Sequence, residues 1–319
     1  MKHTLRASVK NVHWGYYNAG LEPVLKVKSG DTIEVYTVSG GPKIIELLEI
    51  EDQIPKELKE IHEKVEERGP GPHLLLGPIY LEGASIEDAL EITLLEIEPW
   101  VDFGYNLFFP GHGSIPEDFP YLRTKCIQID REKMTAIFSE NLKIPLRPFF
   151  GELGVAPAPY LGKINSGVPG PHGGNLDNKE LVASTKVYLP IHNAGALFSI
   201  GDGHSCQGDG EVDTTALETS MKGLIKLKVM KGVKIKWPMA ESDEHFILMG
   251  FNSDLYEAFK AALRNTIEFL VNKGFTKDDA YMFCSLNVDF HITQVVNRVK
   301  GIHAMVPKGL LQGRTNSII

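Results

Sequence analysis

The chain has 319 residues, 43% of them hydrophobic and 23% charged, with a net charge of −8. This is the composition of an ordinary globular protein with a substantial core, and its negative charge leaves no basic stripe to replace the counterions of nucleic-acid phosphates. No apolar run reaches the roughly 20 residues that span a bilayer, and the first ten residues lack the apolar segment of a signal peptide. We therefore expect neither a nucleic-acid partner nor a membrane partner.

The three cysteines are Cys126, Cys206 and Cys284, and no Cys-x-x-Cys spacing occurs among them. A sparse, odd number of cysteines fits a reducing compartment better than a framework of disulfides. We expect a cytoplasmic protein.

Residues 1–140 are expected to form a mainly β domain with one inserted helix. Alternation of apolar and polar residues predicts the strands. The helix is predicted at 55–68, because Leu58, Ile61 and Val65 fall on one face among lysines and glutamates. The strands are expected at 24–28, 32–37 and 89–97, a long ordered loop at 100–119, and a hairpin at 125–138.

Residues 141–240 are expected to form a glycine-rich β region. Glycine and proline are dense between 149 and 178, but the apolar residues among them indicate that this segment packs against a core. Further strands are predicted at 186–191 and 196–200, and a pair of strands at 224–236.

Residues 241–319 are expected to form a smaller α+β portion with C-terminal helices. Ser253 or Asp254 can cap a helix whose apolar residues recur every three or four positions, and Gly274 can end it. Thr276, followed three residues later by Asp279, resembles a capping box and opens a second helix.

The chemistry is predicted to lie just after the strand at 196–200. The glycine-punctuated segment that follows holds Asp202 and His204, then Asp209 and Glu211, each pair two residues apart and therefore on one side of an extended backbone. Three carboxylates and an imidazole so close together suit a hard or borderline cation. Gly-Asp-Gly is also common turn material, so a simple loop is the alternative interpretation.

Several separated segments together resemble the acetamidase/formamidase family of amidohydrolases. The resemblance covers nearly the whole chain, and the order and combination of the segments make it specific. The segments are His73-x-x-x-Gly77-Pro78 with Glu82-Gly83-Ala84, Phe150-Gly151-x-x-Gly154-Val155-Ala156-Pro157, His172-Gly173-Gly174-Asn175-Leu176-Asp177, Gly195 to His204 with Gln207-Gly208-Asp209-Gly210-Glu211, Thr215-Ala216-Leu217-Glu218, and the tail Asp289 to Val306.

The resemblance implies hydrolysis of a small aliphatic amide, of the formamide or acetamide type, to a carboxylate and ammonia by metal-activated water. It also implies a mainly β fold: a jelly-roll-like sandwich with barrel-like strands and a smaller α+β portion. A homodimer is expected, with a divalent metal in the site, zinc as the main expectation and calcium as an additional ion.

On this resemblance we expect His73, Asp202 and His204 to be metal ligands and Glu211 to be the catalytic acid/base. A carboxylate that cycles between base and acid can take a proton from water and give it to the departing nitrogen. The expected substrate-binding residues, or groups that orient the ligands, are Asp177, Asp209, His172 and Asn175.

Two alternatives stay open. The first is a metal-stabilised jelly-roll protein that binds without catalysis, since only a catalytic site keeps an open position for water. The second is a thiolate amidase that uses Cys206, which lies two residues after His204. The sequence does not distinguish formamide, acetamide, a cyclic amide or a metabolite-derived amide as the substrate.

Overall fold

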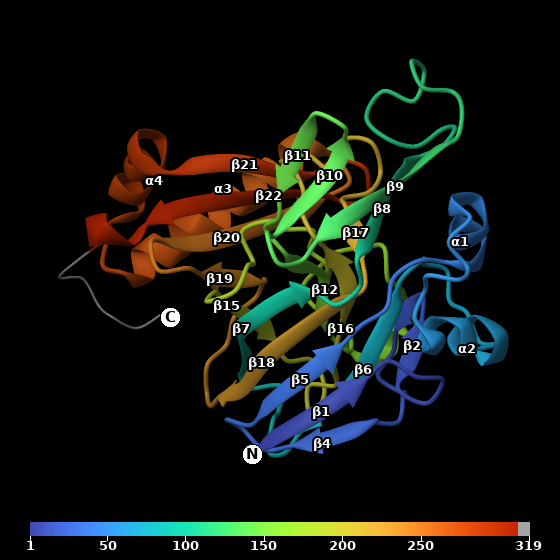
Figure 1. Cartoon of the computed structure of the whole chain (residues 1–319). Coiled ribbons are helices and arrows are strands. Elements are labelled where there is room, and N and C mark those ends of the chain that lie inside the picture. Colours follow the sequence, from blue (N-terminus) through green and yellow to red (C-terminus); the bar gives the residue numbers. More distant parts are fainter. Residues whose placement is uncertain (312–319) are drawn as a thin grey trace.

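Two large β-sheets make up most of the computed structural model, which describes residues 1–311 (Figure 1). The first sheet has nine strands and is antiparallel except where β1 pairs with β5. In spatial order its strands are β1 (Lys2–Arg6), β5 (Thr32–Tyr36), β18 (Met221–Met230), β7 (Ala89–Pro99), β15 (Lys186–Pro190), β19 (Met239–Glu241), β20 (His245–Asn252), β22 (Lys300–Pro307) and β21 (Asp289–Gln294).

The second sheet has eleven strands. Its main path runs through β11 (Leu142–Pro145), β10 (Thr135–Ser139), β9 (Arg123–Asp130), β8 (Phe103–Phe108), β17 (Glu218–Thr219), β16 (Phe198–His204), β12 (Phe149–Val155) and β14 (Gly173–Asn175). Strand β6 (Leu74–Leu81) also pairs with β16, and it holds β2 (Val12–Trp14) and β4 (Leu25–Val27). A separate short pair joins β3 (Tyr16–Tyr17) to β13 (Ile164–Asn165).

The described helices are few, so the fold is mainly β as expected. They are α1 (Pro42–Leu48), α2 (Lys56–Lys64), α3 (Leu255–Asn272) and α4 (Lys277–Asn287), with short 3₁₀ turns at Pro159–Leu161 and Lys308–Leu311. Figure 1 shows α3 and α4 beside β20, β21 and β22, and α3 packs directly on β20 and β22. No helix in the described part of the chain is long and apolar enough to cross a membrane.

The main hydrophobic core takes side chains from both sheets. Ile33, Ile92 and Leu227 come from the nine-stranded sheet, Phe150 and Ile200 come from the other, and all are fully buried. Strand β18 alternates between buried and more exposed residues, as expected for a strand with one face on a core. Strands β12 and β16 are buried at every position. Polar side chains on these two strands therefore lie inside the protein.

Both C-terminal helices begin as predicted. The side chain of Asp254 accepts a hydrogen bond from the backbone N–H of Glu257, and that of Thr276 accepts one from Asp279. Gly274 follows α3 with a φ of 89°, the left-handed conformation that glycine adopts without steric cost. The amphipathic helix at 55–68 is confirmed as α2, slightly shorter than expected.

Three predictions of local structure were wrong. The expected loop at 100–119 contains β8, whose Phe103, Tyr105 and Leu107 alternate and are buried. The expected pair of strands at 224–236 is the single strand β18, because it lies between β5 and β7 and its chain does not turn back to pair with itself. The strand expected to end at residue 200 continues to His204.

The nine-stranded sheet takes strands from each of the three ranges 1–140, 141–240 and 241–319. These ranges therefore share one sheet, and their division into separate domains stays a prediction. Residues 312–319 of the last range lie outside the described residues.

Candidate active site

Strands β12 and β16 form the base of the candidate site. They are antiparallel, with Glu152 opposite Gly201 and Phe150 opposite Gly203. A Cβ atom on Gly151 would lie 2.5 Å from Oδ2 of Asp202 and 2.7 Å from Oδ1 of Asp177. Gly151 therefore leaves the space into which these carboxylates point.

Two histidines and three carboxylates meet beside this glycine. Nε2 of His204 lies 3.2 Å from Oδ2 of Asp202 and 3.2 Å from Oε1 of Glu218. Nε2 of His73 lies 3.7 Å from the same Asp202 oxygen, and its Nδ1 lies 2.9 Å from Oε1 of Glu152. The predicted trio of His73, Asp202 and His204 is thus brought together, from β16 and the residue before β6.

Asp177 is held from one side only. Its Oδ2 accepts hydrogen bonds from the amides of Asn175 (2.7 Å) and Asn297 (2.8 Å). Its Oδ1 is buried and has no hydrogen-bond partner. The carboxylate is therefore oriented with one oxygen left available inside the cavity.

Gln207 links His204 to the backbone around it. Its amide nitrogen donates to the carbonyl oxygen of Asp177 (2.7 Å), and its amide oxygen lies 2.9 Å from Nδ1 of His204. Because the nitrogen already faces a carbonyl, the oxygen must face the imidazole, and Nδ1 must carry the proton. Nε2 of His204, which points toward Asp202 and Glu218, is then the atom that can offer a lone pair.

Glu211 reaches the cluster from the loop after β16. It is buried, and one of its oxygens groups with Asp177 and His204 within 4.8 Å. Backbone hydrogen bonds tie the loop to the end of β21, from Gly210 N–H to Thr293 and from Val295 N–H back to Gly210. The C-terminal portion therefore positions the proposed acid/base.

Burial raises the pKa of each carboxyl that lies near Asp202. Burial and the neighbouring Asp202 charge, opposed by His204, raise the pKa of Asp177 to about 7. Burial, together with the charge of Asp177, raises the pKa of Glu211 well above its usual range. Burial also raises the pKa of Glu152 and Glu218.

The neighbouring carboxylates raise the pKa values of the two imidazoles. Burial alone would lower the pKa of His73, but Asp202 and Glu152 outweigh it and raise the pKa to about 10. Burial would also lower the pKa of His204, but the charges of Glu218 and Asp202 outweigh burial and raise this pKa well above its usual value. Although burial disfavours its charge, Asp202 has a lowered pKa because both imidazoles face it. The cluster therefore attracts positive charge.

The donor set fits a divalent cation. Five carboxyls surround two imidazoles, so the buried cluster carries more negative than positive charge whenever its carboxyls are ionised. Such charge is costly to bury without a counterion. Tetrahedral ligands at about 2.1 Å from zinc lie about 3.4 Å from one another, close to the 3.2 Å and 3.7 Å separations around Asp202. Within this cluster, two groups are able to chelate: Asp202, His204 and Glu218, and Asp177, His204 and Glu211.

Two predicted residues lie outside the cavity. The buried imidazole of His172 packs edge-on against Tyr17, with ring centroids 5.2 Å apart, and burial lowers its pKa to about 3. Asp209 is 36% exposed and pairs with His291 at 2.9 Å and Lys179 at 3.4 Å. Neither residue lines the cavity that contains the cluster.

Sequence reasoning missed four residues of the site. Glu152 had a detectable signal, since it is the one carboxylate in the otherwise apolar strand Phe149–Val155. Glu218 and Gln207 lie in segments that carried the family resemblance, but nothing local distinguished them. Asn297 lies in the tail segment of the resemblance, but nothing local distinguished it, because its partner Asp177 is 120 residues away.

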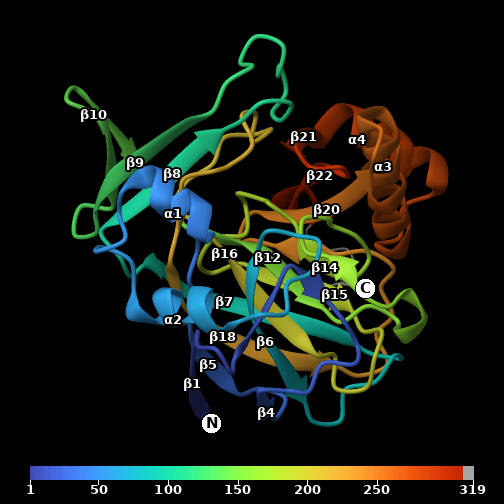
Figure 2. The ribbon, with the colours of Figure 1, turned by 90° about the vertical axis from the view of Figure 1, so that its right-hand side faces the viewer.

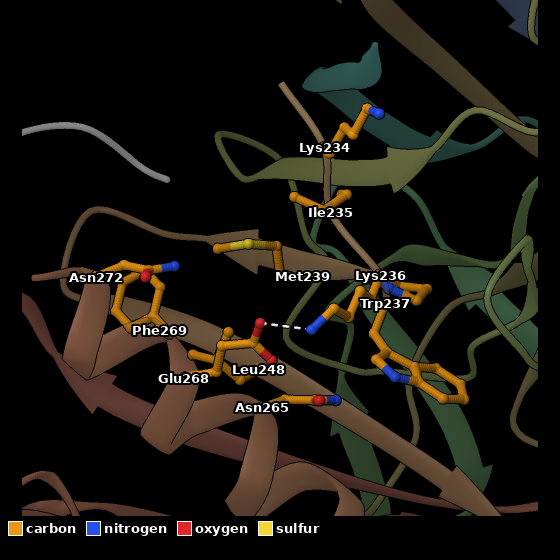
Figure 3. A pocket seen from close by; sticks show the side chains of 11 residues that line it. Lys234, Ile235, Lys236, Trp237, Met239, Leu248, Asn265, Glu268, Phe269 and Asn272 are labelled. Atoms are coloured by element: carbon orange, nitrogen blue, oxygen red, sulfur yellow. Dashed lines mark hydrogen bonds and ion pairs between the residues drawn. The ribbon is translucent and has the colours of Figure 1, made fainter. Parts of the chain in front are cut away.

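The cluster forms the floor of a cavity of about 370 Å³. Asp177, Asp202, Glu211 and Glu218 line it together with His73 and Asn175. A smaller cavity of about 110 Å³ lies where residues 234–239 pass along α3 (Figure 3). Its described lining has the Lys236–Glu268 ion pair (2.7 Å) but no histidine, so it lacks the chemistry of the larger cavity.

Cys206 does not share the geometry of the cluster. Its side chain packs against the small apolar group of Ile127, Ala136 and Leu217 and does not line the cavity. Burial raises the pKa of its thiol, which holds it in the protonated, weakly nucleophilic form.

Carboxylates and imidazoles with strongly shifted pKa values at the floor of a cavity are typical of an enzyme active site. The chain belongs to the Acetamidase/Formamidase family, whose sequence profile matches residues 8–167 and 162–311. It is 30% identical to the formamidase of Methylophilus methylotrophus over 300 aligned residues, covering 70% of this chain and 73% of that one.

Solved structures agree with the family assignment. The acetamidase of Bacillus halodurans superposes with a TM-score of 0.83 and 29% identity, covering 97% of this chain and 98% of that one. The acetamidase of Yersinia enterocolitica gives a TM-score of 0.82 and 28% identity, covering 98% of this chain and 93% of that one.

Proposed function

We propose that this protein is an amidase that hydrolyses a small aliphatic amide to a carboxylate and ammonia. The observation that carries the proposal is the carboxylate–imidazole cluster, in which Asp202 lies between His73 and His204 while Glu211 approaches from a separate loop. Family membership and the formamidase and acetamidase names of the relatives support the same reaction.

We further propose that His73, Asp202 and His204 hold a divalent ion, with Glu218 as a fourth donor. Zinc is the ion we favour, since imidazoles with carboxylates are its usual donors. Calcium as an additional ion would suit the carboxylate-rich side of the cluster around Asp177. When bound, the ion would lower the pKa of a coordinated water and polarise the amide carbonyl.

The protein's own residues then manage protons and orientation. Glu152 contacts Nδ1 of His73, and Gln207 fixes the proton on Nδ1 of His204. Glu211 takes a proton from the attacking water as the water oxygen bonds to the carbonyl carbon. It returns that proton to the nitrogen as the C–N bond breaks, so the products are a carboxylic acid, which ionises, and ammonia.

The remaining expectations from the family resemblance are also proposals. We propose that the two large sheets make up the jelly-roll-like sandwich and barrel-like strands, and that the protein forms a homodimer. The cytoplasmic location stays a prediction.

The test is ammonia release from short amides by the full-length protein, before and after chelation and after addition of Zn²⁺. We expect turnover that disappears on chelation and returns with the metal. Full turnover in a verified metal-free preparation would refute the metal-dependent mechanism, and a metal-loaded protein that hydrolyses no amide would refute the amidase assignment. A protein that binds Zn²⁺ tightly without turnover would favour the non-catalytic alternative.

A further inference from the structure

The cavity is much larger than a two-carbon amide requires. A water molecule occupies about 30 Å³ in the liquid, so the four heavy atoms of acetamide fill about 120 Å³ at similar density. The cavity measures about 370 Å³, within the range of pockets that enclose drug-sized ligands. Beside a bound acetamide there is room for several further heavy atoms.

The wall beyond the cluster combines apolar side chains from several segments with uncharged polar ones. It comes from five separate segments, which include the chain before α1, strand β8 and the loop after β21. The apolar side chains of this wall are Val38, Ile44, Pro70, Pro72, Leu74, Leu107, Phe109, Val168 and Val296. Figure 2 shows α1, which carries Ile44, next to β8 and β9.

Charged side chains other than the cluster lie only at the rim of the described cavity. The two residues there that can carry positive charge, His112 and Arg298, are both exposed. The other described lining residues beyond the cluster, which include the polar Ser39, Tyr105, Asn165, Thr214, Thr215 and Asn297, carry no charge to neutralise an ionised group on a ligand. An uncharged substituent is therefore the one that this wall accommodates.

From this wall and volume we propose that the preferred substrate is a primary amide whose apolar acyl group is several carbons longer than acetyl. The proposal rests on the amidase function above and specifies its substrate class. Each buried methylene strengthens binding about fourfold. Formamide and acetamide would leave the apolar side chains of the wall in contact with water, so the wall favours the longer amide.

The first test measures kcat/KM of the Zn²⁺-reconstituted full-length protein for acetamide, butyramide, hexanamide and phenylacetamide. We expect kcat/KM to rise along the series, with hexanamide or phenylacetamide exceeding acetamide by about tenfold or more. Equal or higher kcat/KM for acetamide would overturn the substrate inference and leave the amidase function standing. Absence of hydrolysis with every amide would overturn both.

A charged analogue tests the apolar character separately. The monoamide of adipic acid has the chain length of hexanamide but ends in a carboxylate. We expect its kcat/KM to be at least about tenfold lower than that of hexanamide, because burial of its charge has no partner in the wall. A higher kcat/KM for the monoamide would overturn the inference and assign substrate recognition to Arg298.

The second test reduces the space in the cavity beside the apolar wall. Ile44→Trp places a larger ring at a half-buried cavity position on α1, and Leu47→Trp, on the same helix, is the matched control, since Leu47 is 49% exposed and does not line the cavity. We expect Ile44→Trp to lower the ratio of hexanamide to acetamide kcat/KM by about tenfold, and Leu47→Trp to leave the ratio unchanged. An unchanged ratio in a folded Ile44→Trp protein would place the acyl group elsewhere.

Discussion

At the scale of single residues, a substitution of Glu211 separates proton transfer from metal binding. Glu211 groups with Asp177 and His204, which could also chelate an ion, but it approaches from its own loop. We expect Glu211→Gln to lose about 10²- to 10⁴-fold in turnover while metal content stays near that of the wild type, because Gln keeps the size but cannot accept the proton of water.

Turnover, metal stoichiometry and melting temperature should be measured on one batch of the Glu211→Gln protein. Loss of bound metal together with turnover would make Glu211 a ligand instead of the acid/base. Unchanged turnover would remove it from the mechanism.

We expect Gln207 to affect metal binding only through His204. Its hydrogen bonds to the Asp177 carbonyl and to Nδ1 of His204 place the imidazole proton on Nδ1. Gln207→Met keeps the shape but loses both bonds, and we expect metal affinity to fall about 10- to 100-fold. Calorimetric titration with Zn²⁺ measures this directly. The control is Gln128→Met on the exposed part of β9, and equal affinities in the two variants would contradict the proposed role.

At the scale of elements, the helices could be predicted and the strands of the site only in part. The caps of α3 and α4 form between residues three apart, so the sequence contains both partners close together. The extension of β16 to His204 depends instead on its antiparallel pairing with β12, some 50 residues away in the sequence. Glycines that read as loop material serve here to let two buried strands and their carboxylates approach closely.

This role of glycine can be tested at Gly151. In Gly151→Ala the new methyl would meet Asp202 and Asp177 at 2.5 Å and 2.7 Å, so the carboxylates must move apart. We expect the variant to fold but to bind Zn²⁺ at least about tenfold more weakly and to lose most of its turnover. Gly208→Ala is the control, since nothing lies within 4 Å of its added methyl. Normal Zn²⁺ affinity in Gly151→Ala would show that the site tolerates the displacement.

At the scale of the whole molecule, the site depends on contacts that local patterns do not contain. Asp202 and His204 could be predicted because their spacing along one strand places them on the same side. His73 and Asp177 needed the family resemblance, and Asn297 could not be found because folding alone brings it to Asp177. For Asp209 the same spacing argument did not hold. Asp209 is two residues from Glu211, but Glu211 lines the cavity and Asp209 pairs with His291 outside it.

The same long-range assembly makes overall stability depend on the cation. Residues before β6 and on β12, β16 and β17 bring carboxyl and imidazole groups into one buried cluster, so an ion held by that cluster binds the folded state and not the unfolded one. At a Zn²⁺ concentration 100 times the Kd, the gain is about 2.7 kcal/mol, which corresponds to a rise in melting temperature of about 5 °C.

Differential scanning fluorimetry of chelated protein, with and without added Zn²⁺, measures this rise without any substrate. Asp202→Asn should abolish the rise, because Asp202 lies between both imidazoles. Asp209→Asn should retain it, because Asp209 pairs with Lys179 and His291 outside the cavity. A Zn²⁺-dependent rise that survives Asp202→Asn and is lost in Asp209→Asn would move the stabilising ion from the cavity to the Asp209 side of the loop.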